Sequence, residues 1–174
     1  CLWDNGVRYF AVSNLDEAIA VRKSCSEAEI LILGYTPPEY AQTLADENII
    51  QGIVSSEYAA ELSKFTSKPV RCHVKIDTGM GRIGCLPEEA AEIASFIASS
   101  AHLALGGMCT HCAAADSTER ENRVYTEMQF RAFMTAIENV KKAGINPGIC
   151  HCSASAAMLD HPEMQLDMVR AGII

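Results

Sequence analysis

Short apolar runs, rich in Val, Ile and Leu, alternate along the chain with longer stretches in which apolar residues recur at helical spacing. The short runs are bounded by Gly, Pro, Ser or Asn, which favour turns, so we predict strands there. The expected strands are residues 8–12, 30–33, 50–54, 70–76, 103–109, 149–153 and 168–174. Strands that alternate with helices are typical of βα units and a parallel sheet.

The stretches between the strands carry helix signals. Asn14 is suited to cap one helix, and Ser55 or Ser56 is suited to cap another that ends at residue 65. Prolines, which are tolerated in a first helical turn, precede two more. Asn14 would thus precede a helix over residues 16–23, and the prolines would precede helices over 39–47 and 88–99. A long helix is expected over about residues 118–142.

About seven strands at such short intervals predict an α/β fold, a (β/α)₈ barrel of the TIM type, with residues 1–174 as one domain. A doubly wound sheet would more often show a glycine-rich phosphate loop after its first strand, and none follows residues 8–12. A complete barrel has eight strands and roughly 250 residues. We therefore expect an incomplete barrel that lacks the first strand.

Composition favours a globular protein that handles small molecules. The chain has 174 residues, of which 49% are hydrophobic and 21% charged, as is ordinary for a soluble domain. Its net charge of −8 argues against nucleic acid and acidic membrane surfaces as partners. No apolar run reaches the roughly 20 residues that span a bilayer, so we expect a cytoplasmic protein.

The eight cysteines admit a disulfide framework or a metal site as alternatives. The chain is too large and aliphatic to need disulfides, and several cysteines lie in strand-like runs, where free cysteine acts as a small buried hydrophobe. Cysteine and histidine cluster at 109–112 and 150–152. Their adjacent or alternating spacing fits zinc poorly, so we predict no metal.

The most distinctive stretch is 73–84, where a strand leads into a glycine-rich turn that contains Arg82. A guanidinium suits bidentate pairing with a carboxylate or phosphate, and glycines let the backbone approach a ligand. An arginine on a solvated loop is the alternative, and spacing alone leaves the two open.

Three further residues follow or lie on strands: His111, Ser155 and Arg170. Taken singly, His111 fits a hydrogen-bonded structural residue better than a ligand-binding one. Ser155 fits a plain helix cap, and Arg170 a structural ion pair, as well as either fits a ligand-binding role. In a barrel, however, the carboxyl ends of all strands surround one mouth. We therefore expect Lys75, Arg82 and these three residues to converge.

The segment Lys-Ile-Asp-Thr-Gly-Met-Gly-Arg-Ile-Gly at 75–84 resembles the signature of the alanine racemase family, which racemises a small amino acid on pyridoxal phosphate. Three later segments agree in order and spacing: Thr-His at 110–111, Ser-Ala-Ser-Ala-Ala at 153–157 and Asp-Met-Val-Arg-Ala-Gly-Ile at 167–173. Many relatives have asparagine at the position of Ala154, so the local hydrogen bonding there is in question.

The resemblance implies roles around the cofactor. His111 would lie against the pyridine ring, and Arg170 would face the pyridine nitrogen. Ser155, together with the backbone of Gly172 and Ile173, would bind the phosphate, as the last βα loops of this fold often do.

Two more roles concern the substrate. The resemblance implies that Arg82 orients the substrate carboxylate and the phenolic oxygen of the cofactor. Its partner in the family is a lysine, often carbamylated, at the position of Lys75. We predict either a carbamate or a bound anion at Lys75, because two bare cations would otherwise face each other.

The implied activity is the interconversion of L- and D-alanine, which supplies D-alanine for a bacterial cell wall, by a homodimer. The chain starts without methionine and stops inside an apolar run, so we expect a fragment. The family's Schiff-base lysine and its opposing tyrosine belong to a first strand and a carboxyl-terminal β domain outside it. The fragment should hold no catalytic base, bind the cofactor weakly or not at all, and be inactive. Alternatives are a racemase for serine or another small amino acid, and a non-catalytic pyridoxal phosphate barrel.

Overall fold

A computed structural model describes residues 2–172 and shows an α/β fold built on one parallel sheet. The sheet has six strands in the order β1-β2-β3-β4-β5-β6, and each strand pairs in parallel with the next one along the chain. The strands are β1 (Tyr9–Val12), β2 (Glu29–Ile32), β3 (Ile49–Ile53), β4 (Val70–Lys75), β5 (Leu103–Cys109) and β6 (Ile149–His151). Sequential order without a switch point is that of a barrel rather than a doubly wound sheet.

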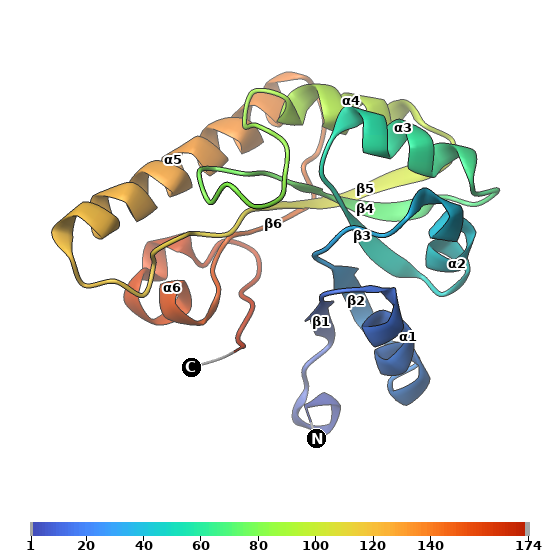
Figure 1. Ribbon diagram of the computed structural model, residues 1–174, viewed down its shortest axis with the longest axis horizontal. Helices are drawn as coiled ribbons and strands as arrows, with labels where there is room; N and C mark the ends of the chain where they lie inside the picture. The colour runs from blue at the N-terminus through green and yellow to red at the C-terminus, as the bar shows by residue number, and fades with distance from the viewer. Residues whose placement is uncertain (1, 173–174) are drawn as a thin grey trace.

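The sheet curls into a half-barrel, with helices along its convex side (Figure 1). The first and the last described residues lie on the opposite, open side in this view. The helices are α1 (Leu15–Ser24), α2 (Ala41–Asp46), α3 (Ser56–Lys64), α4 (Ala90–Ser99), α5 (Arg120–Lys142) and α6 (Ser155–Asp160). Short 3₁₀ turns occur at η1 (Trp3–Asn5), η2 (Pro38–Tyr40) and η3 (Pro162–Met164).

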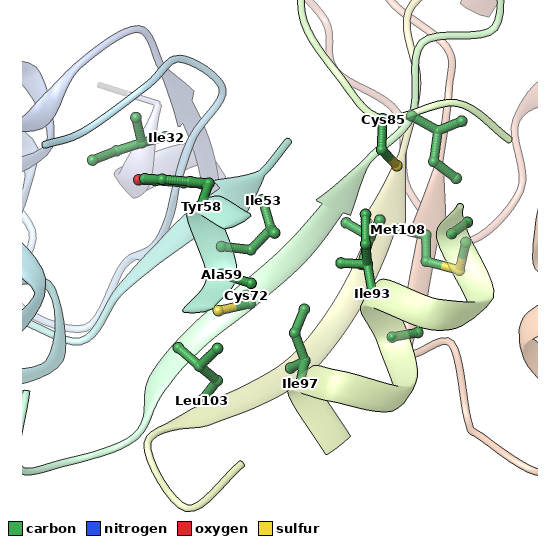
Figure 2. Packing of buried hydrophobic residues seen from close by; sticks show 14 of the residues in the cluster. Ile32, Ile53, Tyr58, Ala59, Cys72, Cys85, Ile93, Ile97, Leu103 and Met108 are labelled. Atoms are coloured by element: carbon green, nitrogen blue, oxygen red, sulfur yellow. The ribbon is translucent and has the colours of Figure 1, made fainter. Parts of the chain in front are cut away.

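The main hydrophobic core lies between the sheet and these helices. On β4, alternate residues point to opposite faces, so Val70, Cys72 and Val74 pack against the helices while His73 and Lys75 face the barrel interior. Figure 2 shows part of this core, with Cys72 and Met108 from the sheet and Ile93 and Ile97 from α4. Burial of this aliphatic layer is the main favourable term in folding.

Local sequence signals explain several element boundaries. Asn14 caps α1 by accepting a hydrogen bond from the Glu17 N–H, and Ser55, rather than Ser56, caps α3 through the Tyr58 N–H. The helix expected over 39–47 is divided into η2 and α2. No helix in the described part of the chain is long and apolar enough to cross a bilayer.

The expectation of about seven strands was wrong for the described residues. Of the segment predicted as a strand over 168–174, the described residues form an isolated bridge, between Arg170 and Ala154. The Asp167 N–H donates to the Cys150 carbonyl in β6, and the Arg170 N–H donates to the Ser153 carbonyl after β6. The Asp167 carboxylate accepts the Cys150 N–H, which a backbone carbonyl would accept in a regular ladder. Residues 173 and 174 lie outside the described residues.

The expectation of free cysteines was confirmed for all seven cysteines in the described residues, six of them buried. Cys109 and Cys150 lie on neighbouring strands, and Cys152 directly follows β6. These thiols fill space in the core, as small hydrophobic side chains do.

Candidate functional site

A cavity of about 570 Å³ opens at the carboxyl ends of the strands. Its lining combines four polar or charged side chains that the sequence singled out with small and apolar residues from the first two strands. The lining residues are Ala11, Ser13, Leu33, Gly34, Lys75, Arg82, Ile83, His111, Ala154, Arg170, Ala171 and Gly172. Of the five residues expected to converge, Lys75, Arg82, His111 and Arg170 line this cavity, and Ser155 does not.

Lys75 is the last residue of β4, and it is 5% exposed. Among residues 2–172 its ammonium has no hydrogen-bond or ion-pair partner. Burial lowers the pKa of Lys75, and the nearby cations Arg170 and Arg82 lower it further, although Cys109 acts in the opposite direction. A buried amine of lowered pKa beside two guanidiniums calls for an anion or for loss of its charge.

Arg82 sits at the mouth on a loop that Asp77 organises. The Asp77 carboxylate accepts hydrogen bonds from the backbone N–H groups of Gly79, Gly81 and Arg82, at 2.9, 3.0 and 3.1 Å. Burial tends to raise the pKa of Asp77, but these N–H bonds outweigh it and lower the pKa. The exposed Arg82 guanidinium has no ion-pair partner in the described part of the chain and is free to meet a ligand carboxylate.

Glycine is required in this loop. Gly79 has a φ of +129°, and a Cβ there would lie 2.4 Å from the Tyr125 hydroxyl oxygen. That hydroxyl instead donates a hydrogen bond of 2.6 Å to the Gly79 carbonyl. Gly84 has a φ of +139° and would clash with the backbone of Asp77. The glycine pattern that marked this stretch in the sequence thus reflects close backbone packing.

The Arg170 guanidinium contacts several of the polar groups around the cavity. Its Nη2 donates to the carbonyl oxygens of Thr110 and Cys152 at 2.9 and 3.1 Å, and lies 3.5 Å from His111 Nδ1. Its Nη1 donates to His151 Nδ1. The expected cost of placing this charge on an apolar segment is therefore met by hydrogen bonds to carbonyls and imidazoles, not by an acidic partner.

The arginine fixes the tautomers of two buried histidines. Because a guanidinium only donates, His151 Nδ1 must be an acceptor, so the proton of His151 sits on Nε2. His151 Nε2 lies 3.1 Å from His73 Nδ1 and donates to it. Burial and the charge of Arg170 lower the pKa of His151 to about 2, and burial with the charges of Arg71 and Arg170 lowers that of His73 to about 4. Both rings are neutral near pH 7.

His111 lines the cavity in its neutral form. Burial lowers its pKa to about 4, and the cations Arg170, Lys75 and Arg82 act in the same direction. A neutral, half-buried imidazole offers a flat apolar face as well as one donor. This arrangement suits stacking on an aromatic ligand better than pairing with an anion.

Ser155 lies beside the cavity rim and contacts the Gly172 backbone. The Gly172 N–H donates to Ser155 Oγ at 2.9 Å, so the serine hydroxyl proton is left to donate elsewhere. Ala154, without a side-chain cap, precedes α6, and Ser153 donates to the Met164 carbonyl instead of capping. The predicted contribution of Ile173 lies outside the described residues.

Sequence reasoning did not single out His73, His151 or Thr110 as site residues. A signal for His73 existed: it stands two residues before Lys75 on one strand and therefore shares its face. His151 aligns with Cys109 across β5 and β6, a register that single-sequence patterns do not reveal. No group of three or more His, Cys, Asp or Glu side chains within residues 2–172 could hold a metal ion.

Comparison with known proteins places these residues in a family. The family model described as alanine racemase, N-terminal domain, matches residues 1–174. The chain belongs to the alanine racemase N-terminal domain family. Its half-barrel is thus that of an alanine racemase N-terminal domain.

Individual relatives agree with this membership. Alanine racemase of Desulfovibrio desulfuricans is 48% identical over 172 residues, covering 97% of this chain and 46% of the relative. An amino-acid racemase of Enterococcus faecalis is 36% identical over 169 residues, covering 97% of this chain and 24% of the relative. The structure of Clostridium difficile 630 alanine racemase in complex with cycloserine has a TM-score of 0.91 at 35% identity, covering 99% of this chain and 48% of that one. The chain thus spans about half the length of these alanine racemases or less.

Proposed function

We propose that this chain is the cofactor-binding half of a pyridoxal-phosphate-dependent alanine racemase. The observation that carries the proposal is the convergence of Arg82, His111 and Arg170, three residues of the family motifs, on one cavity. Its volume of about 570 Å³ suits a small cofactor together with a small amino acid. Two guanidiniums and a buried lysine favour anionic ligands.

The residues present fit the cofactor. Ser155 keeps a hydroxyl proton for a phosphate oxygen, beside the backbone at Gly172. The neutral imidazole of His111 offers its face to the pyridine ring. Arg170 is held toward the cavity by two carbonyls, where it would donate to the ring nitrogen. Pyridoxal phosphate, when bound, withdraws electrons from the substrate Cα and so acidifies its proton.

Arg170 tunes this chemistry through its permanent charge. A guanidinium does not give up its proton, so it disfavours protonation of a nitrogen to which it donates. The neutral His151 behind it accepts one Arg170 N–H and keeps the guanidinium oriented. We infer that the cofactor is thereby held as a moderate electron acceptor, which suits a reaction that returns the proton to the same carbon.

Arg82 binds the substrate carboxylate, and Lys75 supports it. Carbamylation would convert the buried Lys75 ammonium into an anion that pairs with Arg82 and removes the repulsion between cations. Intact-mass measurement of the native protein should show the mass of one added carbon dioxide, lost in Lys75→Arg. An unmodified Lys75 in a protein that also binds no anion there would contradict this step.

A chimera tests the activity. In it, this chain replaces the matching 172 residues of Desulfovibrio desulfuricans alanine racemase, which then supplies the rest of the enzyme. We expect racemisation of L-alanine with bound pyridoxal phosphate, and a loss of about 100-fold or more in kcat/KM for Arg82→Met, because the substrate carboxylate loses a bidentate partner. A folded, cofactor-loaded chimera without racemase activity would contradict the proposal.

Racemisation of another small amino acid is the second candidate, favoured by the relative from Enterococcus faecalis that is named only as an amino-acid racemase. Parallel assays with L-alanine and L-serine distinguish the two. A cell-wall role, a cytoplasmic location, a homodimer, inactivity of the isolated chain and a non-catalytic cofactor-binding role stay predictions from the family resemblance.

A further inference from the structure

A buried glutamine on α5 joins the two loops that carry Arg82 and His111. Gln129 is 1% exposed although it lies on a helix of the outer layer. Its Oε1 accepts the Ala113 N–H at 2.9 Å, next to His111, and its Nε2 donates to Thr78 Oγ1 at 3.4 Å, inside the Arg82 loop. Neither contact belongs to the hydrophobic packing of the helix.

The hydrogen bonds continue from Thr78 in one forced direction. The Ile76 carbonyl can only accept, so Thr110 Oγ1 donates its proton to it, at 2.8 Å. Thr110 Oγ1 therefore accepts from Thr78 Oγ1, 2.9 Å away, and Thr78 must in turn accept from Gln129. The amide orientation is also fixed, because Ala113 requires an acceptor. Donors and acceptors are thus consistent along the whole chain of bonds.

This series of hydrogen bonds ends at Arg170. Thr110 is fully buried, and its backbone carbonyl accepts the Arg170 Nη2 bond of 2.9 Å. Thr110 thus joins the hydrogen bonds that start at Gln129, through its hydroxyl group, to Arg170, through its backbone carbonyl. A second contact from α5, the Tyr125 hydroxyl on the Gly79 carbonyl, holds the same Arg82 loop from outside.

We propose that Gln129, acting through Thr78 and Thr110, is a positioning residue that sets the Arg82 loop against the His111 loop and so fixes the distance between the substrate carboxylate and the cofactor ring. This inference rests on the proposed function for its consequence in catalysis. Its structural part, coupling of two loops through one buried amide, is independent of any activity.

The discriminating variant is Gln129→Glu. In its ionised form, a carboxylate of nearly the same shape still accepts from Ala113 but cannot donate to Thr78, so the variant is compared at a pH at which the introduced carboxyl group is ionised. If Thr78 turns its hydroxyl toward the carboxylate, Thr110 loses its donor, so one bond of the chain is lost either way. Phe133→Leu is the matched control, because Phe133 is fully buried on the same helix and packs only in the hydrophobic core.

Hydrogen exchange on the unmodified chain and on both variants tests the coupling without activity. In Gln129→Glu we expect the Gly81 and Arg82 amides of the Asp77 loop to exchange about tenfold faster than in Phe133→Leu, after correction for the change in global stability measured by urea unfolding. Equal exchange in the two variants would overturn the proposal.

The same substitutions in the chimera test the catalytic consequence. We expect Gln129→Glu to raise the KM for L-alanine about tenfold with kcat changed by less than about threefold, because Arg82 binds the substrate carboxylate before and during the reaction. Phe133→Leu should change neither the KM nor kcat, once the enzyme concentration is corrected for the fraction of folded protein. A KM unchanged by Gln129→Glu would overturn the positioning role. An inactive parent chimera would refute the proposed function alone and leave hydrogen exchange to decide the coupling.

Discussion

The two walls of the cavity differ in chemistry although both are built from the ends of parallel strands. The polar wall consists of Lys75, Arg82, His111 and Arg170, on or after β4 and later strands. The apolar wall consists of Ala11, Leu33 and Gly34, on or after β1 and β2, with Ser13 as its one polar side chain. The same scaffold therefore carries ionisable groups on one side and none on the other.

The two walls also differ in the free energy that is lost when their side chains are buried. Buried cations and neutral histidines lose hydration, and the polar wall compensates through backbone carbonyls that converge on Arg170. The apolar wall has no such groups to satisfy. Perturbations of charge should consequently act through the polar wall, while changes of similar size in the apolar wall should have little effect on stability.

The largest expected effect is a loss of stability in acid. The pKa values of His73 and His111 fall from 6.5 to about 4 on folding, and that of His151 to about 2, so the unfolded chain binds more protons below pH 6.5. Stability is fully present above pH 6.5 and falls below it. The fall is up to about 1.4 kcal/mol per pH unit for each of the buried His73 and His151 down to its folded pKa, and less for the half-buried His111, whose charge solvent screens. Urea unfolding between pH 7 and 5 measures this slope. His73→Gln should reduce the slope, and an unchanged slope would contradict the prediction.

Arg170→Met should have the next largest effect on the polar wall. It leaves the Thr110 and Cys152 carbonyls without their donor, which should cost about 2–4 kcal/mol of unfolding free energy. Removal of the charge should also raise the pKa of His111 and His151, measurable by NMR titration. Leu33→Met, on the apolar wall, is the control. Imidazole pKa values that stay low in Arg170→Met would contradict the assignment of their cause.

Lys75→Met should stabilise the chain in buffer free of carbon dioxide and other added anions. The substitution removes a buried cation that has no partner among the described residues, and we expect a gain of about 1–2 kcal/mol. Because folding lowers the pKa of Lys75, the parent should regain stability as pH rises toward 10.5, and the variant should not. Chemical denaturation at several pH values measures both. A loss of stability would mean that Lys75 is paired or carbamylated.

Asp77→Asn should have a smaller effect, about 1 kcal/mol. An asparagine oxygen still accepts from Gly79 and Gly81, but the amide nitrogen cannot accept the Arg82 N–H. The parent should also lose this contribution as pH falls through the lowered pKa of Asp77, since the paired form is the carboxylate. Thermal unfolding compares the variant with Glu138→Gln, an exposed change on α5. Equal stability of the two variants would show that the loop is held by other contacts.

The smallest effect is expected for Ala11→Ser on the apolar wall. Ala11 is exposed to the cavity, so a hydroxyl there stays hydrated, and stability should change by less than about 0.5 kcal/mol. Urea unfolding is again the measurement. A larger loss would show that this wall is energetically as demanding as the other one.

The strand positions and the convergence of cations could be predicted from the sequence, because hydrophobic periodicity and glycine placement are local properties. The pattern marks the strand end at Lys75 and the glycine-rich turn at Arg82, while their ligand-binding roles came from the family resemblance. His151 and Gln129 could not, since their roles depend on the register of β5 against β6 and on how α5 packs over two loops. The strand predicted over 168–174 is not formed by its described residues, and the Asp167 side chain just before them takes the place of a backbone acceptor.

The Asp167 carboxylate accepts the Cys150 N–H in place of a backbone carbonyl, and this affects how the last described segment is held against the sheet. Two backbone bonds join this last segment to Cys150 in β6 and to Ser153 after it, and the Arg170 guanidinium adds bonds to the carbonyls of Thr110, after β5, and Cys152, after β6. The arginine therefore fastens the segment that presents it. Docking of the segment and completion of the polar wall are therefore coupled, so a molecule with the segment detached would lose the Arg170 side of that wall in one step rather than gradually.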